Sequence, residues 1–310
     1  IQLALFRNQF ASIAEQMGEV LRAAALSVNI RERLDFSCAL FDQEGHLVVN
    51  APHIPVHLGA MGMTVRAVKQ RFPDLSAEEF CVINDPYQGG SHLPDVTVVA
   101  PVDCEGLRFY VASRAHHAEI GGRAPGSMPA TATDLEEEGV ILTGERLAHN
   151  DPRLKAKLVK LFQHGAYPSR DPQTNATDVL AQVIANKLGA KLLQQLAGEA
   201  GPATVQSYMQ HMQQAAKTKV SDYIKAQFQD GESFQAQLPL ETGGELAVTI
   251  AIDHLPTPKM QVKFGATPTD TGNRNATSGI VYATVFYVIR MLIGEDMPLN
   301  EGLLQGIAIE

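Results

Sequence analysis

Residues 84–102, NDPYQGGSHLPDVTVVAPV, join a polar, glycine-rich head directly to an alternating apolar run. The NDP triplet predicts a turn, because Asn and Asp side chains bond nearby backbone and proline fixes its own φ. The run DVTVVAPV predicts a strand by its alternation. His92 and Asp95 therefore lie three residues apart at the mouth of a strand. A rigid element behind a pair of polar side chains is what a binding site needs.

The sequence on either side of this stretch predicts a mixed α/β layer. Residues 3–27 space their apolar side chains as an amphipathic helix does, and a second helix is predicted over 58–71, before Pro73. SCALFDQEGHLVV predicts two strands around a turn at 42–45, and EFCVIN and LRFYVASRAHHAEI predict two more.

The second half of the chain changes from helices back to strands. Two long helical patterns over 174–229, separated by GEAGP, predict an antiparallel helical hairpin. SFQAQLPL, ELAVTIAID and KMQVKFGA predict strands, and an apolar helix is predicted over 277–292. The expected class is α+β, with mixed α/β layers: mixed sheets, flanking helices and the inserted hairpin.

These patterns divide the chain into three expected parts. Residues 1–150 form a mixed α/β domain that carries the candidate metal site around His92 and Asp95. Residues 151–230 form the helical hairpin region, and 231–310 form a β-rich segment with an apolar helix. The chain begins at Ile1 inside a helical pattern and ends in the strand-like run LLQGIAIE. We therefore expect a piece of a longer polypeptide, continuing into a further C-terminal part.

Composition disfavours several classes of partner. The 310 residues are 45% hydrophobic, and 25 basic against 34 acidic residues give a net charge of −9, which argues against nucleic-acid or anionic-membrane binding. No apolar run reaches the roughly 18 residues that span a bilayer, and we expect a cytoplasmic protein. The three scattered cysteines predict reduced, mostly buried thiols rather than a disulfide framework.

A second polar cluster, RAHHAEIGG at residues 114–122, follows the next predicted strand. If the two strands are neighbours, His92 and Asp95 can meet either His116 or His117. Adjacent strand residues point to opposite faces, so only one of these two histidines can share the pocket. Two imidazoles and a carboxylate suit Zn, Mn or Fe with an open position for water or substrate. The alternative is that the histidines only satisfy loop or core hydrogen bonds.

Further polar residues are candidates for the site, and each has an alternative structural role. Asp35, at the start of a strand, is either an additional metal ligand or part of a solvated helix end. His53 and His57 lie in HIPVHLG, where they order a loop, or His57 lines the site. GRAPGSMP and EEEGVIL predict a loop over the site, with Glu138 either an acid or base or part of a solvated acidic turn.

Other catalytic signatures are missing from the sequence. There is no GxxxxGK(S/T) run and no well-placed GxGxxG, so a phosphate-binding loop is not evident. Ser91 follows two glycines but lacks a GxSxG elbow and a matching partner constellation. Cys38 and Cys81 lie within predicted strands and are poor candidates for nucleophiles.

Long motifs in a fixed order resemble the hydantoinase B / 5-oxoprolinase family across nearly the whole chain. They are ERLDFSCALFD, HIPVHLGAM, NDPYQGGSHLPDVTVVAPV, SRAHHAEIGGRAPGSMP, TGNRNATSGIVYATVFYVIR and MPLNEGLL. The resemblance implies a subunit that works with a hydantoinase A-type partner, which binds ATP and activates a lactam or carbonyl oxygen by phosphorylation. The B-type subunit then completes ring opening or, in the related acetone and acetophenone carboxylases, carboxylation.

The resemblance also implies a site. Its metal ligands fall on His92, Asp95, His117 and Asp35, and the choice of His117 over His116 rests on the resemblance alone. His116 and Glu138 remain as candidate catalytic residues.

The motif HLPDVTVVAPV is closer to the hydantoinase and oxoprolinase branch, so we expect a subunit of an ATP-dependent cyclic amide hydrolase with a divalent transition metal. The alternatives are a ketone carboxylase subunit and a non-catalytic scaffold. A hetero-oligomer with self-association is expected, and the helical pair at 174–229 serves either as a contact surface or simply as a packed hairpin.

Overall fold

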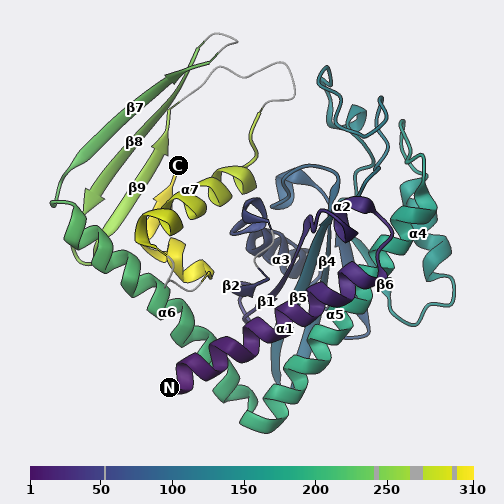
Figure 1. The fold of residues 1–310 in the computed structure, drawn as a ribbon, viewed down its shortest axis with the longest axis horizontal. Helices are drawn as coiled ribbons and strands as arrows, with labels where there is room; N and C mark the ends of the chain where they lie inside the picture. Colours follow the sequence, from purple (N-terminus) through teal and green to yellow (C-terminus); the bar gives the residue numbers. More distant parts are fainter. Residues whose placement is uncertain (52–53, 241–243, 266–274, 295–298) are drawn as a thin grey trace.

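The chain folds into two β-sheets with helices packed around them, which confirms the predicted α+β class (Figure 1). The computed structural model describes residues 1–51, 54–240, 244–265, 275–294 and 299–310. The helices are α1 (Gln2–Ala24), α2 (Val28–Arg31), α3 (Ala60–Arg71), α4 (Leu154–Phe162), α5 (Pro172–Ala200), α6 (Pro202–Gln227) and α7 (Ser278–Ile293). Four short 3-10 helices accompany them: η1 (Pro55–His57), η2 (Pro86–Gln88), η3 (Leu135–Glu137) and η4 (Glu301–Gly306).

The first sheet has six strands in the order β2-β1-β5-β4-β3-β6, and every neighbouring pair is antiparallel. Its strands are β1 (Phe36–Phe41), β2 (Leu47–Asn50), β3 (Glu79–Ile83), β4 (Asp95–Cys104), β5 (Leu107–His116) and β6 (Glu145–Ala148). Glu105 and Gly106 join β4 to β5 with φ of 44° and 89°, the two positive values that a tight hairpin turn requires. The hairpin therefore brings the start of β4 and the end of β5 to the same end of the sheet.

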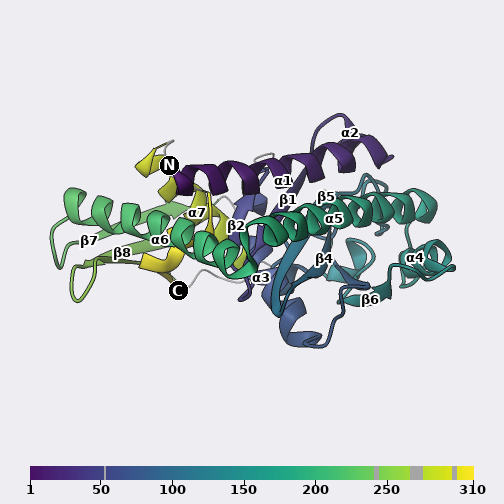
Figure 2. The same ribbon diagram turned by 90° about the horizontal axis from the view of Figure 1, so that it is seen from below.

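Both faces of the first sheet are covered. Figures 1 and 2 show α1 and α5 side by side on one face, where Phe36 and Val98 belong to the largest core. The opposite face packs Ala112 and Val99 against α3 to form a second core. Because side chains alternate along a strand, each residue of β5 is committed to one of these two layers.

The two predicted helices over 174–229 are present as α5 and α6, but they do not lie along each other. Figure 1 shows them diverging from Gly201. The reason is that α5 is bonded to the first sheet: the side-chain amide of Gln182 donates to Val96 O and that of Asn186 donates to Val98 O, both over 2.9 Å. The helix α6 instead leads to the second sheet.

The second sheet has the order β10-β9-β8-β7, with β10 parallel to β9 and the other pairs antiparallel. Its strands are β7 (Ser233–Pro239), β8 (Glu245–Asp253), β9 (Lys259–Phe264) and β10 (Ile307–Ile309). Figure 1 shows α7 between this sheet and the α3 side of the first one, and the third core includes Phe286, Val220 and Met260. The strands predicted before α7 are all present, as β1 to β5 and β7 to β9, whereas β6 and α4 were not predicted.

The final segment connects the two halves. The buried carboxylate of Glu301 in η4 accepts from the backbone N–H of Leu47 over 2.8 Å and lies 2.7 Å from Nη2 of Arg66. The predicted strand at LLQGIAIE is shorter than expected, because its first half forms η4 and only its end forms β10.

Two expectations from composition can be compared with the structure. All three cysteines are free and buried, as predicted. Within the described parts of the chain, no helix is long and apolar enough to cross a membrane.

Candidate metal centre

The β4–β5 hairpin places a histidine and an aspartate directly opposite each other. Asp95 at the first position of β4 pairs with His116 at the last position of β5. Cross-strand partners share a face of the sheet, so both side chains point to the α3 side. His92 reaches the same point from the turn before β4, where the backbone N–H of Asp95 donates to the carbonyl of His92 over 3.1 Å.

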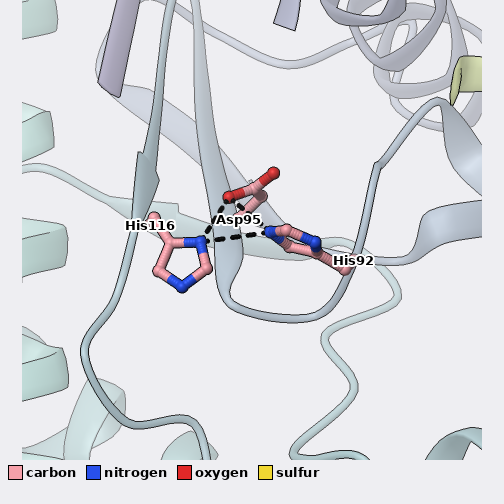
Figure 3. Close-up of side chains that lie close together, drawn as sticks. All are labelled: His92, Asp95 and His116. Carbon is pink, nitrogen blue, oxygen red and sulfur yellow. Dashed lines mark hydrogen bonds and ion pairs between the residues drawn. The ribbon is translucent and has the colours of Figure 1, made fainter. Parts of the chain in front are cut away.

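Three potential ligand atoms form a small triangle there (Figure 3). His92 Nε2 and His116 Nδ1 are 3.1 Å apart, and Asp95 Oδ1 lies 3.1 Å from the former and 3.2 Å from the latter. Two ligand atoms at about 2.1 Å from one ion lie about 3.0 Å apart at a right angle and about 3.4 Å apart at a tetrahedral angle. The three separations fall in that interval, so the donor set fits a divalent transition metal.

The other carboxylate oxygen of Asp95 is held separately. The hydroxyl of Ser91 donates to Oδ2, and Nε2 of His57 lies 3.3 Å from it. His57 is fixed in turn by Ser37, whose Oγ is 3.0 Å from Nδ1. Such outer contacts orient a ligating group. Oδ1 of Asp95 thus belongs to the triangle, and Oδ2 is held by Ser91 and His57.

Charge supports an ionised ligand. Burial alone would raise the pKa of Asp95, but the charge of His57 and the hydrogen bonds from His116, His57 and His92 hold that pKa well below its usual value. A metal ligand must be deprotonated to bind. For His92, burial lowers the pKa, but the hydrogen bond and charge of Asp95 outweigh it and the net shift is upward.

The structure separates His116 from His117, and it is His116 that joins His92 and Asp95. His117 follows β5 and turns to the other side of the sheet, toward α5. Its Nδ1 lies 3.1 Å from the Asn175 amide nitrogen and its Nε2 lies 3.3 Å from Gln182 Oε1. The placement therefore differs from the expected ligand set, because neighbouring residues point to opposite faces.

Asp35 lies at the edge of the triangle. Its Oδ2 is 3.8 Å from His116 Nδ1, and its carbonyl accepts from the His116 backbone N–H over 3.0 Å. Asp35 is not part of the triangle, and its role as a further ligand stays a prediction. His53, the other histidine of the HIPVHLG stretch, lies outside the described residues.

A cavity of about 420 Å³ adjoins the triangle, and His92 and Glu138 both line it. Burial raises the pKa of Glu138, an effect that the nearby charge of His92 partly offsets. A carboxyl group with a raised pKa is a candidate for a general acid. The two stretches predicted as a loop over the site, GRAPGSMP and EEEGVIL, contribute Met128 and Glu138 to the same cavity.

One buried cation of the site was missed in the sequence. Arg114 is fully buried two positions before His116 and donates to Thr97 Oγ1, Thr64 Oγ1 and Gly89 O over 2.8, 2.8 and 3.0 Å. It thus holds the glycine turn that precedes Ser91. Side chains two positions apart on a strand point to the same face, so counting back from His116 could have identified Arg114.

Three side chains that could act as nucleophiles, those of Ser91, Cys38 and Cys81, lie in surroundings that do not favour this role. Ser91 directs its hydroxyl to Asp95. Burial raises the pKa of the Cys38 thiol and raises that of Cys81 to about 12, which leaves both thiols protonated.

Comparison with known proteins agrees with the motifs. A sequence profile described as hydantoinase B/oxoprolinase matches residues 1–310, the whole chain. The chain belongs to this family. The 5-oxoprolinase 1 of Arabidopsis thaliana is 38% identical over 337 residues, which cover 100% of this chain and 26% of that protein. This member of the family therefore spans about a quarter of the length of the 5-oxoprolinases it matches.

A shorter relative and a solved structure extend the comparison. A protein of Pseudomonas sp. (strain NS671), named as a putative D-/L-hydantoinase subunit, is 25% identical, over 100% of this chain and 55% of its own length. The ATP-dependent caprolactamase from Pseudomonas jessenii has the same fold, with a TM-score of 0.86 and 22% identity, over 100% of this chain and 53% of that chain.

Proposed function

We propose that this chain forms the metal-binding part of an ATP-dependent cyclic amide hydrolase of the hydantoinase or 5-oxoprolinase type. The observation that supports it is the triangle of His92, Asp95 and His116 beside a cavity that also contains Glu138. The family membership supports the reaction class, and the site supplies residues suited to it.

In this proposal His92, Asp95 and His116 hold one divalent transition metal, Zn, Mn or Fe, and Asp35 is the candidate additional ligand. When bound, such an ion polarises a carbonyl oxygen or acidifies a water molecule. Ser91 and His57 keep the Asp95 carboxylate in its orientation through Oδ2.

In this proposal Glu138 donates the proton that ring opening needs. Hydrolysis of a cyclic amide breaks the C–N bond, and the leaving nitrogen must be protonated. Burial favours the protonated form of Glu138, and the residue lines the cavity beside His92. We assign it as the general acid. His116 is assigned here as a ligand instead of an acid or base, and His117 as a support of the strand end.

ATP is assigned to a hydantoinase A-type partner or a further region of the same protein. The sequence of this chain has no phosphate-binding motif, and the relative from Pseudomonas sp. is named as one subunit of a hydantoinase. The partner would phosphorylate the carbonyl oxygen of the cyclic amide and pass the activated ring to this cavity. A hetero-oligomer in the cytoplasm is part of the proposal, consistent with ATP use and three free cysteines.

The test uses the full-length protein with its ATP-binding partner. Elemental analysis should find about one transition metal per chain, and ATP-dependent opening of 5-oxoproline, other lactams or hydantoins should be lost in the His92→Ala variant. A carboxylase would instead consume bicarbonate with a ketone. Partner binding with unchanged turnover in His92→Ala would favour the scaffold and refute the proposal.

A further inference from the structure

Three successive residues beside the cavity have left-handed backbone. Gly126, Ser127 and Met128 have φ of 82°, 63° and 47°. Glycine adopts this conformation freely, but a serine and a methionine do so at a cost in energy. Strain of this kind persists only where the surroundings impose it, and it collects at ligand-binding segments.

Hydrogen bonds impose the strained conformation. The buried hydroxyl of Ser127 accepts from the backbone N–H of Ile120 over 3.0 Å and donates to Gly121 O over 2.8 Å. The backbone N–H of Met128 donates to the carbonyl of Glu138 over 3.0 Å. Met128 is therefore fixed relative to Glu138, and both residues line the cavity.

A second apolar residue of the cavity comes from α7, far away in the sequence. Thr277 Oγ1 donates to Gly90 O over 3.1 Å. Gly279 is packed so closely on the same turn that a Cβ there would lie 2.8 Å from Gly90 O. The start of α7 is thus seated on the turn that carries Ser91, and Ile280 lines the cavity from this helix.

The lining of the cavity contains both polar and apolar side chains. Ser91, His92 and Glu138 are polar, while Met128 and Ile280 are apolar. A compact ring that has both an amide group and carbon atoms needs both kinds of lining group. Small apolar contacts decide between similar ligands, so Met128 and Ile280 can act on the carbon atoms of such a ring.

We propose that Met128 and Ile280 are specificity-determining residues, which contact the carbon edge of a cyclic amide and limit the size of its alkyl substituents. The inference rests on the proposed function, because it takes the ring amide to face His92 and Glu138. It adds the two residues that limit which ring substituents this site accepts.

The test compares two five-membered cyclic amides, one unsubstituted and one with a butyl side chain. Calorimetric binding and ATP-dependent ring opening are measured on the full-length, metal-loaded protein with its partner. Met128→Ala and Ile280→Ala should each shift the preference toward the butyl compound by about tenfold or more, because one methylene in an apolar pocket changes selectivity by about 10- to 200-fold. Met128→Leu should keep the original preference.

Met291→Ala is the matched control, since it removes a methionine side chain from α7 that is 65% exposed and does not line this cavity. Its preference should be unchanged. If one of Met128→Ala and Ile280→Ala does not fold, the other variant still tests the proposal.

The outcomes separate the two proposals. An unchanged preference in folded variants that retain their metal refutes the role of Met128 and Ile280 while leaving the hydrolase intact. A shifted binding preference without ring opening in any protein supports the specificity role and refutes the hydrolase. Failure of the unaltered protein to bind either ring refutes both.

Discussion

The two adjacent histidines, His116 and His117, should fail in different ways when each is replaced by alanine. His116 is part of the ligand triangle and is partly exposed, with 19% of its side chain accessible. His117 is 1% exposed and is bonded on both ring nitrogens to side chains of α5. His116→Ala should therefore lose metal, and His117→Ala should lose stability.

The size of each effect can be worked out from the contacts. Structural zinc sites with four ligands bind with about 10 to 16 kcal/mol, or about 3 kcal/mol per ligand, so His116→Ala should weaken metal binding by about 100-fold or more. His117→Ala leaves Gln182 Oε1 without its hydrogen-bond partner in a buried layer, and it removes one partner of the Asn175 amide nitrogen, which keeps Glu119 O. Each lost hydrogen bond to a buried group costs about 1 to 3 kcal/mol, so the loss of two should lower the free energy of unfolding by about 2 to 6 kcal/mol.

The assay combines metal titration of the chelator-treated protein with urea unfolding followed by circular dichroism. His116→Ala should unfold close to the unaltered metal-free protein, and folded His117→Ala should take up metal with affinity within a few-fold of normal. A His117→Ala protein that folds normally but binds no metal, beside a His116→Ala protein that binds it fully, would refute the assignment.

Three further outcomes are expected. Burial and the charge of Lys187 lower the pKa of His149 to about 4 from the ordinary 6.5, so its neutral form stabilises the fold fully above pH 6.5 and this contribution is lost as pH falls toward 4. Between pH 4 and 7, the free energy of unfolding of His149→Phe should vary by about 2 kcal/mol less than that of the unaltered protein. This figure is below the full effect of the pKa shift because the ring is only half-buried. An unchanged pH profile would contradict the prediction. Glu301→Gln should lower the free energy of unfolding by about 1 to 3 kcal/mol in urea, through its contacts with Arg66 and Leu47, and a loss below about 0.5 kcal/mol would show that η4 is held by packing alone. Removing the metal with a chelator should lower the melting temperature of the unaltered protein and leave that of Asp95→Asn unchanged, and equal shifts would place the ion elsewhere.

Much of the fold follows from local pattern. The alternation in DVTVVAPV and LRFYVASRAHH and the helical spacing of residues 3–27 are strong signals, and these elements are present. The angle between α5 and α6 depends on buried amides bonded to strand carbonyls, which no periodicity reports. The helix α4 was missed although Leu154, Leu158 and Phe162 follow one another at four-residue steps.

The sequence predicted only part of the site, because the choice between His116 and His117 depends on the register of the hairpin. The convergence of His92 and Asp95 with one of two histidines follows from polar residues at strand ends. Alternation could not choose between His116 and His117, because β5 is apolar on both faces. The hairpin turn does choose: counting outward from Glu105 and Gly106 pairs Asp95 with His116.

The packing of the start of α7 against the glycine turn has a consequence for folding during synthesis of the chain. Thr277 and Gly90 are separated by 187 positions in the chain. At about 5 to 20 residues per second, a ribosome needs about 10 to 40 s to travel between them. The β4–β5 hairpin can form early in this interval, whereas the turn before His92 gains its contact with α7 only at the end. In a nascent chain the turn that carries His92 therefore stays open on that side while most of the first sheet is already assembled.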